Sequence, residues 1–373
     1  MFFNLQEKYQ KDEYEKFLKI VGTLSNLFSE SSTPYLYYRV AEKIFCRAFK
    51  AEDLSRSDVS ADAKKDTLGV GLKTFLEGNK KTFQKVAEFG GDKKLFENLS
   101  KEKMILKIAE LRNSRIDFTQ RVHNIEKSIY HCVIRDSGKF KIFEENMGFI
   151  NIDKIKNIKE NKGSISFNDD KEEYSFLTSK NTLTKRFETE NICYEFPIKI
   201  LENPLDILED CLGNLKELDF NQNHHSYETV YLPLYGRSHI VSERSGLNQW
   251  NARGRKRDYN EVYIPIPAII HNLYPDFFPA RDKIFNLKLP NGKTMQSKVC
   301  QDGNKALMSN PNSELGNWIL RDVLKLEEGE LLTYEKLQIL GIDSVRIDKI
   351  SDLEFEINFS LSGSYDKFIN INS

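Results

Sequence analysis

The chain has 373 residues, of which 39% are hydrophobic and 30% charged, and its formal net charge at pH 7 is -1. This composition allows two or three domains with sizeable cores and excludes both a disordered chain and a polycation, so a nucleic-acid surface must be a local patch. The five cysteines lack zinc spacing, the first residues are too charged for a signal peptide, and no apolar run approaches the roughly 20 residues of a membrane span, so we expect a cytoplasmic protein with free thiols.

The first fifty residues predict two helices. Apolar residues recur at helical spacing over residues 4–30 and again over residues 31–49, where Pro34 suits a first helical turn. The stretch that follows, residues 55–76, has short alternating apolar and polar positions interrupted by Gly and Asp. We therefore expect a β-hairpin there.

The rest of the N-terminal half contains segments with helical patterns and segments with strand-like patterns. Residues 79–89 are expected to form a helix, and residues 96–130 one or two long helices. Strand-like runs then dominate from residue 131 to residue 190. Together these elements predict an α+β or α/β domain over residues 1–220, with a mixed sheet, flanking helices and a strand-rich subregion at 131–200.

A polar stretch, "NQNHHSYET" at residues 221–229, contains no large aliphatic residue and predicts a domain boundary. Beyond it, β-like runs dominate and only two pieces look helical, near residues 312–323 and 333–340. We expect a second, β-rich domain over residues 228–367.

The segment from Arg237 to Arg257 is strongly basic in a nearly neutral chain. It holds six positive residues and one acid, Glu243, so its net charge is +5. Arginine suits bidentate contacts to guanine edges and phosphate, and amide and hydroxyl side chains suit adenine edges and phosphates. The alternative is an ordinary solvated basic loop. The candidate DNA-binding residues here are Arg244, Ser245, Gln249, Asn251, Arg253, Arg255, Lys256 and Arg257.

A second polar cluster lies within residues 298–322, in a stretch expected to be mostly loop. Polar loops beside strands often carry recognition residues, although a turn-rich connection is the alternative. Arg321 fits either role. The candidates from this cluster are Gln301, Asp302, Lys305, Ser309 and Asn310.

Three blocks in this half, "NARGRKRDYNEVYIPIP", "FFPARDKIFNLKLPNGK" and "KVCQDGNKALMSNPNSELGNWILRDVL", resemble the C-terminal recognition domain of NgoFVII-type restriction endonucleases. The resemblance covers roughly residues 230 to 365. It implies a seven-stranded DNA-binding pseudobarrel, like the effector domain of EcoRII-type enzymes, that binds double-stranded DNA through two arms around the major groove. By match of blocks, the N-arm is residues 244–258 and the C-arm is residues 301–312.

The hairpin region carries a candidate nuclease pattern. Hydrolysis of a phosphodiester with a metal needs carboxylates that hold Mg²⁺ and a group that polarises water. Restriction nucleases of the PD-(D/E)xK type place an Asp on a hairpin and, ten or more residues later, an acid, one spacer and a lysine. Asp62 and Lys73 resemble this pattern, with Gly71 where the acid is expected. Asp58 and Asp66 remain alternatives to Asp62, and an edge-strand lysine that blocks aggregation is the alternative for Lys73.

The missing acid has two candidates. Glu88 would share a face of the predicted 79–89 helix with Gln84, and some related nucleases move the second acid to such a helix. A solvated helix residue is the alternative for Glu88. Glu42, on the preceding helix, is the other candidate. In this hypothesis Asp62 and Glu88 bind Mg²⁺, Lys73 activates water and Glu42 assists.

These features predict a type II restriction endonuclease, with an N-terminal restriction-endonuclease-like domain that cleaves duplex DNA with Mg²⁺. The alternative is a non-catalytic or modification-dependent DNA-binding protein, which Gly71 favours. A separately encoded DNA methyltransferase and a homodimer are the expected partners, with no membrane. Within the strand-rich subregion, Lys180 to Arg186 form a polar segment that contacts phosphate or is a solvated hairpin end.

Overall fold

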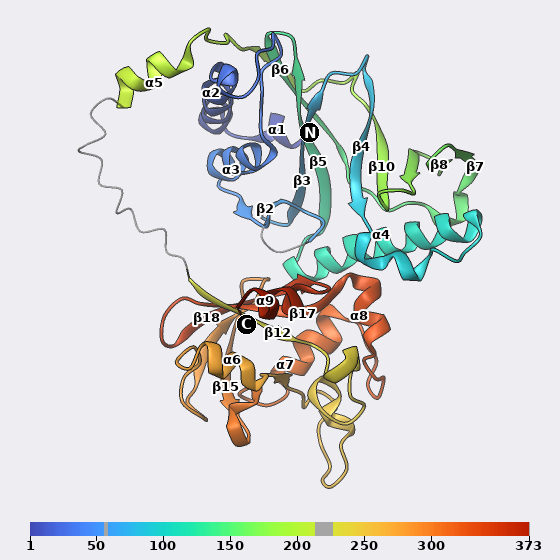
Figure 1. Cartoon of the computed structure of the whole chain (residues 1–373), viewed down its shortest axis with the longest axis vertical. Coiled ribbons are helices and arrows are strands. Elements are labelled where there is room, and N and C mark those ends of the chain that lie inside the picture. Colours follow the sequence, from blue (N-terminus) through green and yellow to red (C-terminus); the bar gives the residue numbers. More distant parts are fainter. Residues whose placement is uncertain (56–58, 213–226, 373) are drawn as a thin grey trace. The chain divides into compact units, whose positions relative to one another are not determined.

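The computed structural model describes residues 1–55, 59–212 and 227–372. Within this part of the chain no helix is both long and apolar enough to cross a membrane. Figure 1 labels the helices and strands along the chain, which combine into three sheets with flanking helices.

The chain divides into two compact units. Unit 1 comprises residues 1–113 and 125–224, and unit 2 comprises residues 114–124 and 225–373. The division at 224/225 falls inside the stretch expected as a boundary, 221–229, of which only 227–229 lie within the described residues. The expectation did not include the return of residues 114–124 to unit 2.

Unit 1 contains a six-stranded sheet in the order β1-β2-β3-β5-β6-β11 and a five-stranded sheet in the order β4-β10-β9-β8-β7. In the first sheet β3 and β5 are parallel and the other pairs are antiparallel. Its helices are α1 (Phe2–Leu5), α2 (Lys8–Thr23), α3 (Tyr38–Phe49), α4 (Lys101–His123) and α5 (Pro204–Leu212). Its strands are β1 (Glu52–Asp53), β2 (Ala63–Lys65), β3 (Leu68–Leu76), β4 (Lys81–Glu88), β5 (Lys127–Asp136), β6 (Lys139–Asn146), β7 (Lys156–Asn161), β8 (Ser164–Asn168), β9 (Glu173–Leu177), β10 (Thr182–Glu188) and β11 (Tyr194–Pro197).

The predicted hairpin is confirmed as β2 and β3, and the two helices before it as α2 and α3. Pro34 does not open a helix, because α3 begins only at Tyr38. The long helix expected between residues 96 and 130 is α4, and the strand-rich texture after residue 131 is confirmed by β5 to β11.

The helix expected over residues 79–89 is wrong, because this segment is strand β4. It pairs antiparallel with β10 along its whole length, from Lys81 opposite Glu188 to Glu88 opposite Thr182. Its Lys, Gln, Ala and Glu residues favour a helix locally. Pairing with a strand about a hundred residues later outweighs that preference, as sheet contacts often do.

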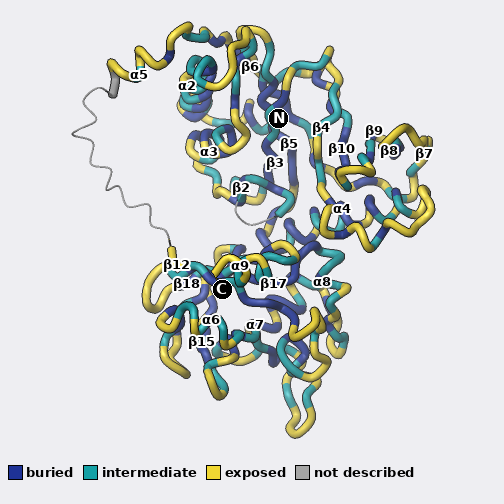
Figure 2. The backbone as a smooth tube through the Cα atoms, in the orientation of Figure 1, coloured by how far each residue is buried: buried dark blue, intermediate teal, exposed yellow. Residues whose placement is uncertain are grey.

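Strand β3 lies at the centre of unit 1 and its two faces differ. Val70 and Leu72 point into a core with Phe45 of α3 and Tyr14 of α2. The other face packs against the five-stranded sheet, where the ring of Phe187 lies 5.9 Å from that of Phe75. Both faces of β3 are therefore largely covered, and Figure 2 shows it mainly in the colours of buried and intermediate residues.

The alternating glycines of β3 make room for side chains of neighbouring segments. A Cβ at Gly71 would lie 2.4 Å from the terminal methyl of Met147 and 3.1 Å from the ring of Tyr130. A Cβ at Gly69 would lie 2.9 Å from the hydroxyl of Ser128. The space beside Gly71 is thus filled by Met147 and Tyr130, and it does not accommodate a carboxylate from elsewhere.

Unit 2 is built on a seven-stranded sheet in the order β12-β17-β18-β14-β15-β16-β13, which is nearly closed like a barrel. The expected seven-stranded, barrel-like second domain is confirmed, as are the two helical pieces, which correspond to α7 with the following π-helix and to α8. Its strands are β12 (Glu228–Pro233), β13 (Ile264–Pro265), β14 (Phe285–Lys288), β15 (Thr294–Cys300), β16 (Ala306–Ser309), β17 (Ile342–Lys349) and β18 (Glu354–Leu361). Its helices are α6 (Ala268–Leu273), α7 (Glu314–Gly316), a π-helix (Asn317–Val323), α8 (Tyr334–Leu340) and α9 (Ser364–Asn372).

The last turns of α4 complete the core of unit 2. Phe118 and Val122 belong to its hydrophobic cluster, and the ring of Phe118 meets that of Phe359 edge-on at 5.3 Å. Phe359 also contacts Trp318, at 5.4 Å between rings. Residues from the middle of the chain are thus part of the C-terminal core.

We predict that Phe118→Ala destabilises unit 2 by about 3–5 kcal/mol, because it removes a ring that is 2% exposed. Both tryptophans of the chain, Trp250 and Trp318, lie in unit 2, so tryptophan fluorescence in a urea titration reports its unfolding. Leu106→Ala, in the unit 1 part of α4, is the matched control and should leave this transition in place. Equal midpoints for wild type and Phe118→Ala would contradict the assignment.

Candidate functional site

Two of the predicted catalytic residues, Glu42 and Lys73, each interact electrostatically with a third, Asp62, at one end of the β2–β3 hairpin. Glu42 is a buried residue of α3, which packs on β1, β2 and β3. Asp62 immediately precedes β2, and the backbone N–H of Leu72 donates a 2.7 Å hydrogen bond to its Oδ2. Lys73 follows Leu72 on β3. Asp62 therefore interacts with Lys73 of the hairpin and with Glu42 of α3. Lys73 nevertheless alternates with Leu72, which faces the α3 side of β3.

The two carboxylates disfavour one another's charge. Burial raises the pKa of Asp62, while Lys73, the N–H of Leu72 and the nearby Arg39 act in the opposite direction. Burial also raises the pKa of Glu42, and the charge of Asp62 raises it further. Two acids held this way favour a proton or an additional cation between them. Such perturbed pKa values are typical of functional sites.

Lys73 is available for chemistry. It is half-buried and, within the described part of the chain, its ammonium has no hydrogen bond or ion pair. Its Nζ lies 6.0 Å from the ring centroid of Tyr130, and its charge acts on Asp62 and on Cys132. A partly buried lysine beside a carboxylate, without a structural partner, differs from a solvated edge-strand lysine.

Two further residues of this site were missed by sequence reasoning. Arg39, one turn before Glu42, donates 3.1 Å hydrogen bonds from Nη1 to Glu42 Oε2 and to the carbonyl of Ser55. Asp53 of β1 is a third carboxylate whose charge raises the pKa of both Asp62 and Glu42. The i, i+3 spacing of Arg39 and Glu42 was the available signal for the first. No local pattern distinguished Asp53.

The other predicted acids lie elsewhere. Glu88 was expected on a helix beside Asp62, but it lies on β4 of the five-stranded sheet, where its carboxylate is 59% exposed and pairs with Lys85 at 2.9 Å. The argument for Glu88 as a metal ligand loses its basis, because no helix forms. Asp66 occupies the β2–β3 turn with φ of 55°, and Asp58 lies outside the described residues.

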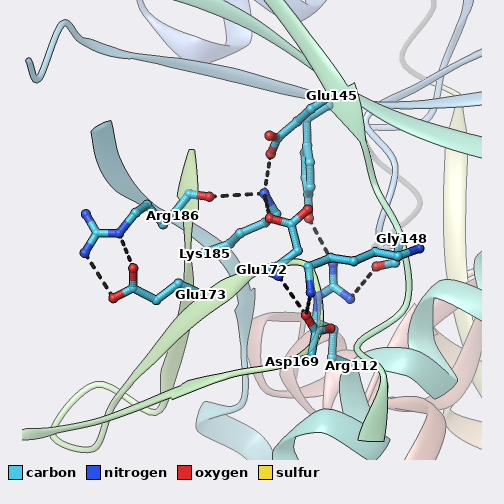
Figure 3. Close-up of polar contacts among 10 residues, drawn as sticks. Arg112, Glu145, Gly148, Asp169, Glu172, Glu173, Lys185 and Arg186 are labelled. Carbon is cyan, nitrogen blue, oxygen red and sulfur yellow. Dashed lines mark hydrogen bonds and ion pairs between the residues drawn. The ribbon is translucent and has the colours of Figure 1, made fainter. Parts of the chain in front are cut away.

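A second charged cluster surrounds Lys185 of β10, and Figure 3 shows its contacts. The side chain of Lys185 is only 2% exposed, and its Nζ lies 2.5 Å from Glu145 and 2.8 Å from Glu172. Burial opposes its charge, but the two carboxylates outweigh burial and raise its pKa. Arg186, next along β10, forms a two-point ion pair with Glu173.

This cluster corrects the expected phosphate contact at Lys185 and Arg186, whereas Lys180 is exposed in the turn between β9 and β10, as the alternative of a solvated hairpin end predicts. Lys185 and Arg186 point neither to phosphate nor freely into solvent, because each is neutralised by its own acids. The adjoining cavity, of about 450 Å³, is lined by acids including Glu145, Glu172 and Glu188, which would repel a phosphate. Lys73 differs from Lys185 because it forms no ion pair with an acid among the described residues.

The N-arm of unit 2 presents exposed cations. Arg244, Arg253 and Lys256 are exposed, and in the described residues their side chains have no hydrogen bond or ion pair. Ser245 precedes a short 3-10 helix and is half-buried. Figure 1 shows the arm, in yellow, extending from the unit. Exposed cations of this kind suit contacts to phosphate.

Other N-arm residues are held within the arm. Asn251 donates a 3.0 Å hydrogen bond to the carbonyl of Glu243. Gln249, Arg255 and Arg257 all turn toward Glu261, an acid that is 9% exposed and directly follows the arm. Sequence reasoning selected the three donors but missed Glu261, because an isolated acid before a strand carries no distinctive pattern.

The C-arm also contains both residues that face solvent and residues that are bonded within the domain. Gln301 begins its loop with φ of 68°, and Lys305 and the side chain of Asp302, 96% exposed, face solvent. Asn310 is half-buried, and its N–H donates to the carbonyl of Gln296. Ser309 is not available as a DNA contact: it is fully buried, and its hydroxyl accepts a 2.8 Å hydrogen bond from the N–H of residue 315.

Arg281 is a further cation beside the C-arm. Its guanidinium is 52% exposed and pairs with Asp302 at 3.2 Å. It lies in the block "FFPARDKIF", which carried part of the resemblance without being selected. Arg321, by contrast, is structural: it donates to Asn260 Oδ1 and to the carbonyls of Tyr259, Leu326 and Glu327.

Residues 222–351 match the family model of the NgoFVII C-terminal B3-like DNA-binding domain, which covers about a third of the chain. The match contains both arms and confirms the resemblance expected for the C-terminal half. No curated protein matches the chain. A DNA-binding domain of restriction-enzyme origin is therefore present in unit 2, and it favours sequence-specific DNA binding.

Asp62→Asn should stabilise the metal-free protein at pH 7, because the raised pKa of Asp62 means that its charge is unfavourable in the folded state. Below about pH 4 Asp62 is neutral both folded and unfolded, so the two proteins should converge there. As pH rises through the folded pKa, wild type loses this stability and Asp62→Asn does not. Thermal unfolding followed by circular dichroism in EDTA measures the difference.

The matched control for this test is Asp136→Asn. Its pKa is lowered by the hydrogen bond from Lys141, so its charge stabilises the fold at neutral pH and the substitution should destabilise. If Asp62→Asn also melted below wild type at pH 7, the strained carboxylate pair would be contradicted.

Proposed function

We propose that this protein is a type II restriction endonuclease that hydrolyses phosphodiester bonds of double-stranded DNA with Mg²⁺. Unit 2 supplies the recognition of a short duplex sequence, and unit 1 supplies the cleavage site. The observation that carries the proposal is Lys73, which has no hydrogen bond or ion pair among the described residues and acts on the carboxylate of Asp62, while Glu42 of α3 lies near Asp62. The same chain also holds a restriction-enzyme DNA-binding domain.

The arrangement of unit 1 supports the nuclease assignment. Asp62 immediately precedes β2 and Lys73 lies on β3 of the same hairpin, an arrangement like that of the PD-(D/E)xK pattern. Glu42, on the helix before the hairpin, interacts with Asp62, and in this proposal it is the second acid that Gly71 lacks. Glu42 replaces Glu88 as the proposed partner of Asp62.

The donor set of the site suits Mg²⁺. This ion prefers oxygen ligands and is usually held by one or two carboxylates together with substrate phosphate and water. No group of three or more His, Cys, Asp or Glu side chains forms a metal cage within the described residues. Asp62 and Glu42 are the two carboxylates that would hold the ion, and since burial raises the pKa of both, a bound cation would favour their charged forms. When bound, Mg²⁺ would neutralise the phosphate and polarise the attacking water.

Lys73 supplies the remaining polar chemistry. Its ammonium can donate hydrogen bonds to the scissile phosphate and to the attacking water, and Asp62 can accept from that water. Arg39 holds Glu42 by a 3.1 Å hydrogen bond and so fixes the direction of its carboxylate. Hydrolysis then forms a bond from water oxygen to phosphorus and breaks the bond to the leaving sugar oxygen, which takes a proton.

Cleavage of both strands requires two such sites, which a homodimer would supply. A separately encoded methyltransferase would protect the host's own copies of the recognised sequence. The second candidate function is a DNA-binding protein without cleavage, and Gly71 at the usual acid position is the observation that favours it.

Plasmid digestion with Mg²⁺ distinguishes the two functions. Lys73→Met should lower the cleavage rate at least 100-fold, the scale of a lost general acid–base group. Lys85→Met is the matched control, because Lys85 is an exposed lysine of the neighbouring strand β4. Glu42→Gln should also lose cleavage, whereas Glu88→Gln should keep it. Cutting by Lys73→Met at the wild-type rate would refute the site.

DNA binding by unit 2 should depend steeply on salt. Each phosphate contact contributes about 0.9 to the slope of log affinity against log salt, so Arg253→Ala and Lys256→Ala should each reduce the slope by roughly 1. Lys336→Ala is the control, because Lys336 is paired with Glu330 outside the arms. A slope unchanged by the arm substitutions in fluorescence anisotropy would exclude the N-arm cations as phosphate contacts.

A further inference from the structure

Glu261 joins the two sides of the N-arm at a single oxygen atom. Its Oε1 accepts a 3.1 Å hydrogen bond from Gln249 Nε2 and a 2.5 Å hydrogen bond from Arg255 Nη2. The Nε of Arg257 lies 3.5 Å from the same oxygen. Gln249 lies in the first half of the arm and the two arginines lie near its end, so one carboxylate connects the two sides of the loop.

The exposure of these groups separates their roles. The side chain of Arg255 is 64% exposed, whereas that of Glu261 is 11% exposed. Arg255 therefore presents part of its guanidinium to solvent while one of its nitrogens is held from behind. Glu261 is too buried to contact a duplex directly, so it would influence DNA binding through the side chains that donate to it.

An arginine reads guanine through two parallel hydrogen bonds, and this contact requires a fixed guanidinium plane. A long side chain otherwise loses rotamer entropy when it orders on binding. An anchoring ion pair reduces that loss in advance. Arg257 is fixed as well, because its Nη1 donates a 2.8 Å hydrogen bond to the carbonyl of Ala252.

We propose that Glu261 is a positioning residue for sequence readout, which orients the exposed guanidinium of Arg255 toward the bases of duplex DNA. This inference rests on the proposed function of unit 2 as a sequence-specific DNA reader. It assigns the specificity of the N-arm to Arg255, which Glu261 holds, and its general affinity to Arg253 and Lys256, which have no partner among the described residues.

Removing Glu261 changes DNA affinity in opposite directions, depending on whether its charge or its positioning of Arg255 dominates. A negative charge next to phosphates weakens binding to any duplex, so removing it should leave non-specific affinity unchanged or raise it. Loss of positioning should instead lower the affinity for the recognised sequence. The ratio of the two affinities therefore reports positioning separately from charge.

The experiment uses the full chain in EDTA, so that binding proceeds without cleavage. A duplex is first enriched by the wild-type protein from a random pool, and a shuffled duplex of the same composition serves as the non-specific probe. Anisotropy titrations then give both affinities for wild type, Glu261→Gln and Glu243→Gln. Glu243 is an exposed acid of the same basic segment, so its substitution removes the same charge without touching the arginines.

Glu261→Gln should lower the ratio of specific to non-specific affinity about tenfold, the discrimination of one bidentate base contact. Glu243→Gln should leave the ratio unchanged. Equal ratios for Glu261→Gln and wild type would overturn the inference. Failure of the wild-type protein to enrich any sequence would instead refute the proposed function of unit 2.

A second variant covers the case in which Glu261→Gln does not fold. Glu261→Asp keeps the charge but shortens the side chain by one methylene, so it cannot reach both donors, Gln249 and Arg255. Its ratio should fall between those of wild type and Arg255→Ala, which removes an exposed side chain. A wild-type ratio for Glu261→Asp together with a lowered ratio for Arg255→Ala would also overturn the positioning role.

Discussion

Two neighbouring carboxylates that are withdrawn from water remain charged only if positive charge lies beside them. Asp62 and Glu42 are such a pair, and burial raises the pKa of both. Lys73 and Arg39 supply part of the compensation, and a divalent cation would supply the rest. The rest of unit 1 holds this arrangement in place: α3 carries Glu42, the β2–β3 hairpin carries the other two groups, and the sheet fixes the hairpin.

Local spacing was enough to predict the parts of this site that lie close together in sequence. The hairpin, Asp62 and Lys73 follow from strand alternation over a dozen residues. The partner of β4 could not be predicted this way, because β10 comes about a hundred residues later in the chain. The acids around Lys185 could not be predicted either, because Glu145 comes from β6 and Glu172 from the residue before β9. The glycine at position 71 was noticed, but Met147, which occupies its space, leaves no pattern in the sequence.

In unit 2, composition identified the basic segment but not which of its cations are exposed and which are held by Glu261. A basic, arginine-rich run predicts a DNA surface whichever residues point outward. The structure separates exposed cations, suited to phosphate, from the group held by Glu261, suited to bases. Phosphate contacts give affinity and base contacts give specificity, so this separation lets the two properties vary independently.

The central claim is that one chain both reads a DNA sequence and cuts near it. The most direct measurement is to digest a random DNA library with the wild-type protein and Mg²⁺ and to sequence the fragment ends. The account predicts ends at a fixed distance from one short motif, and that motif should be the one enriched by binding in EDTA. Ends scattered without a shared motif, or no ends while the motif is still bound, would contradict it.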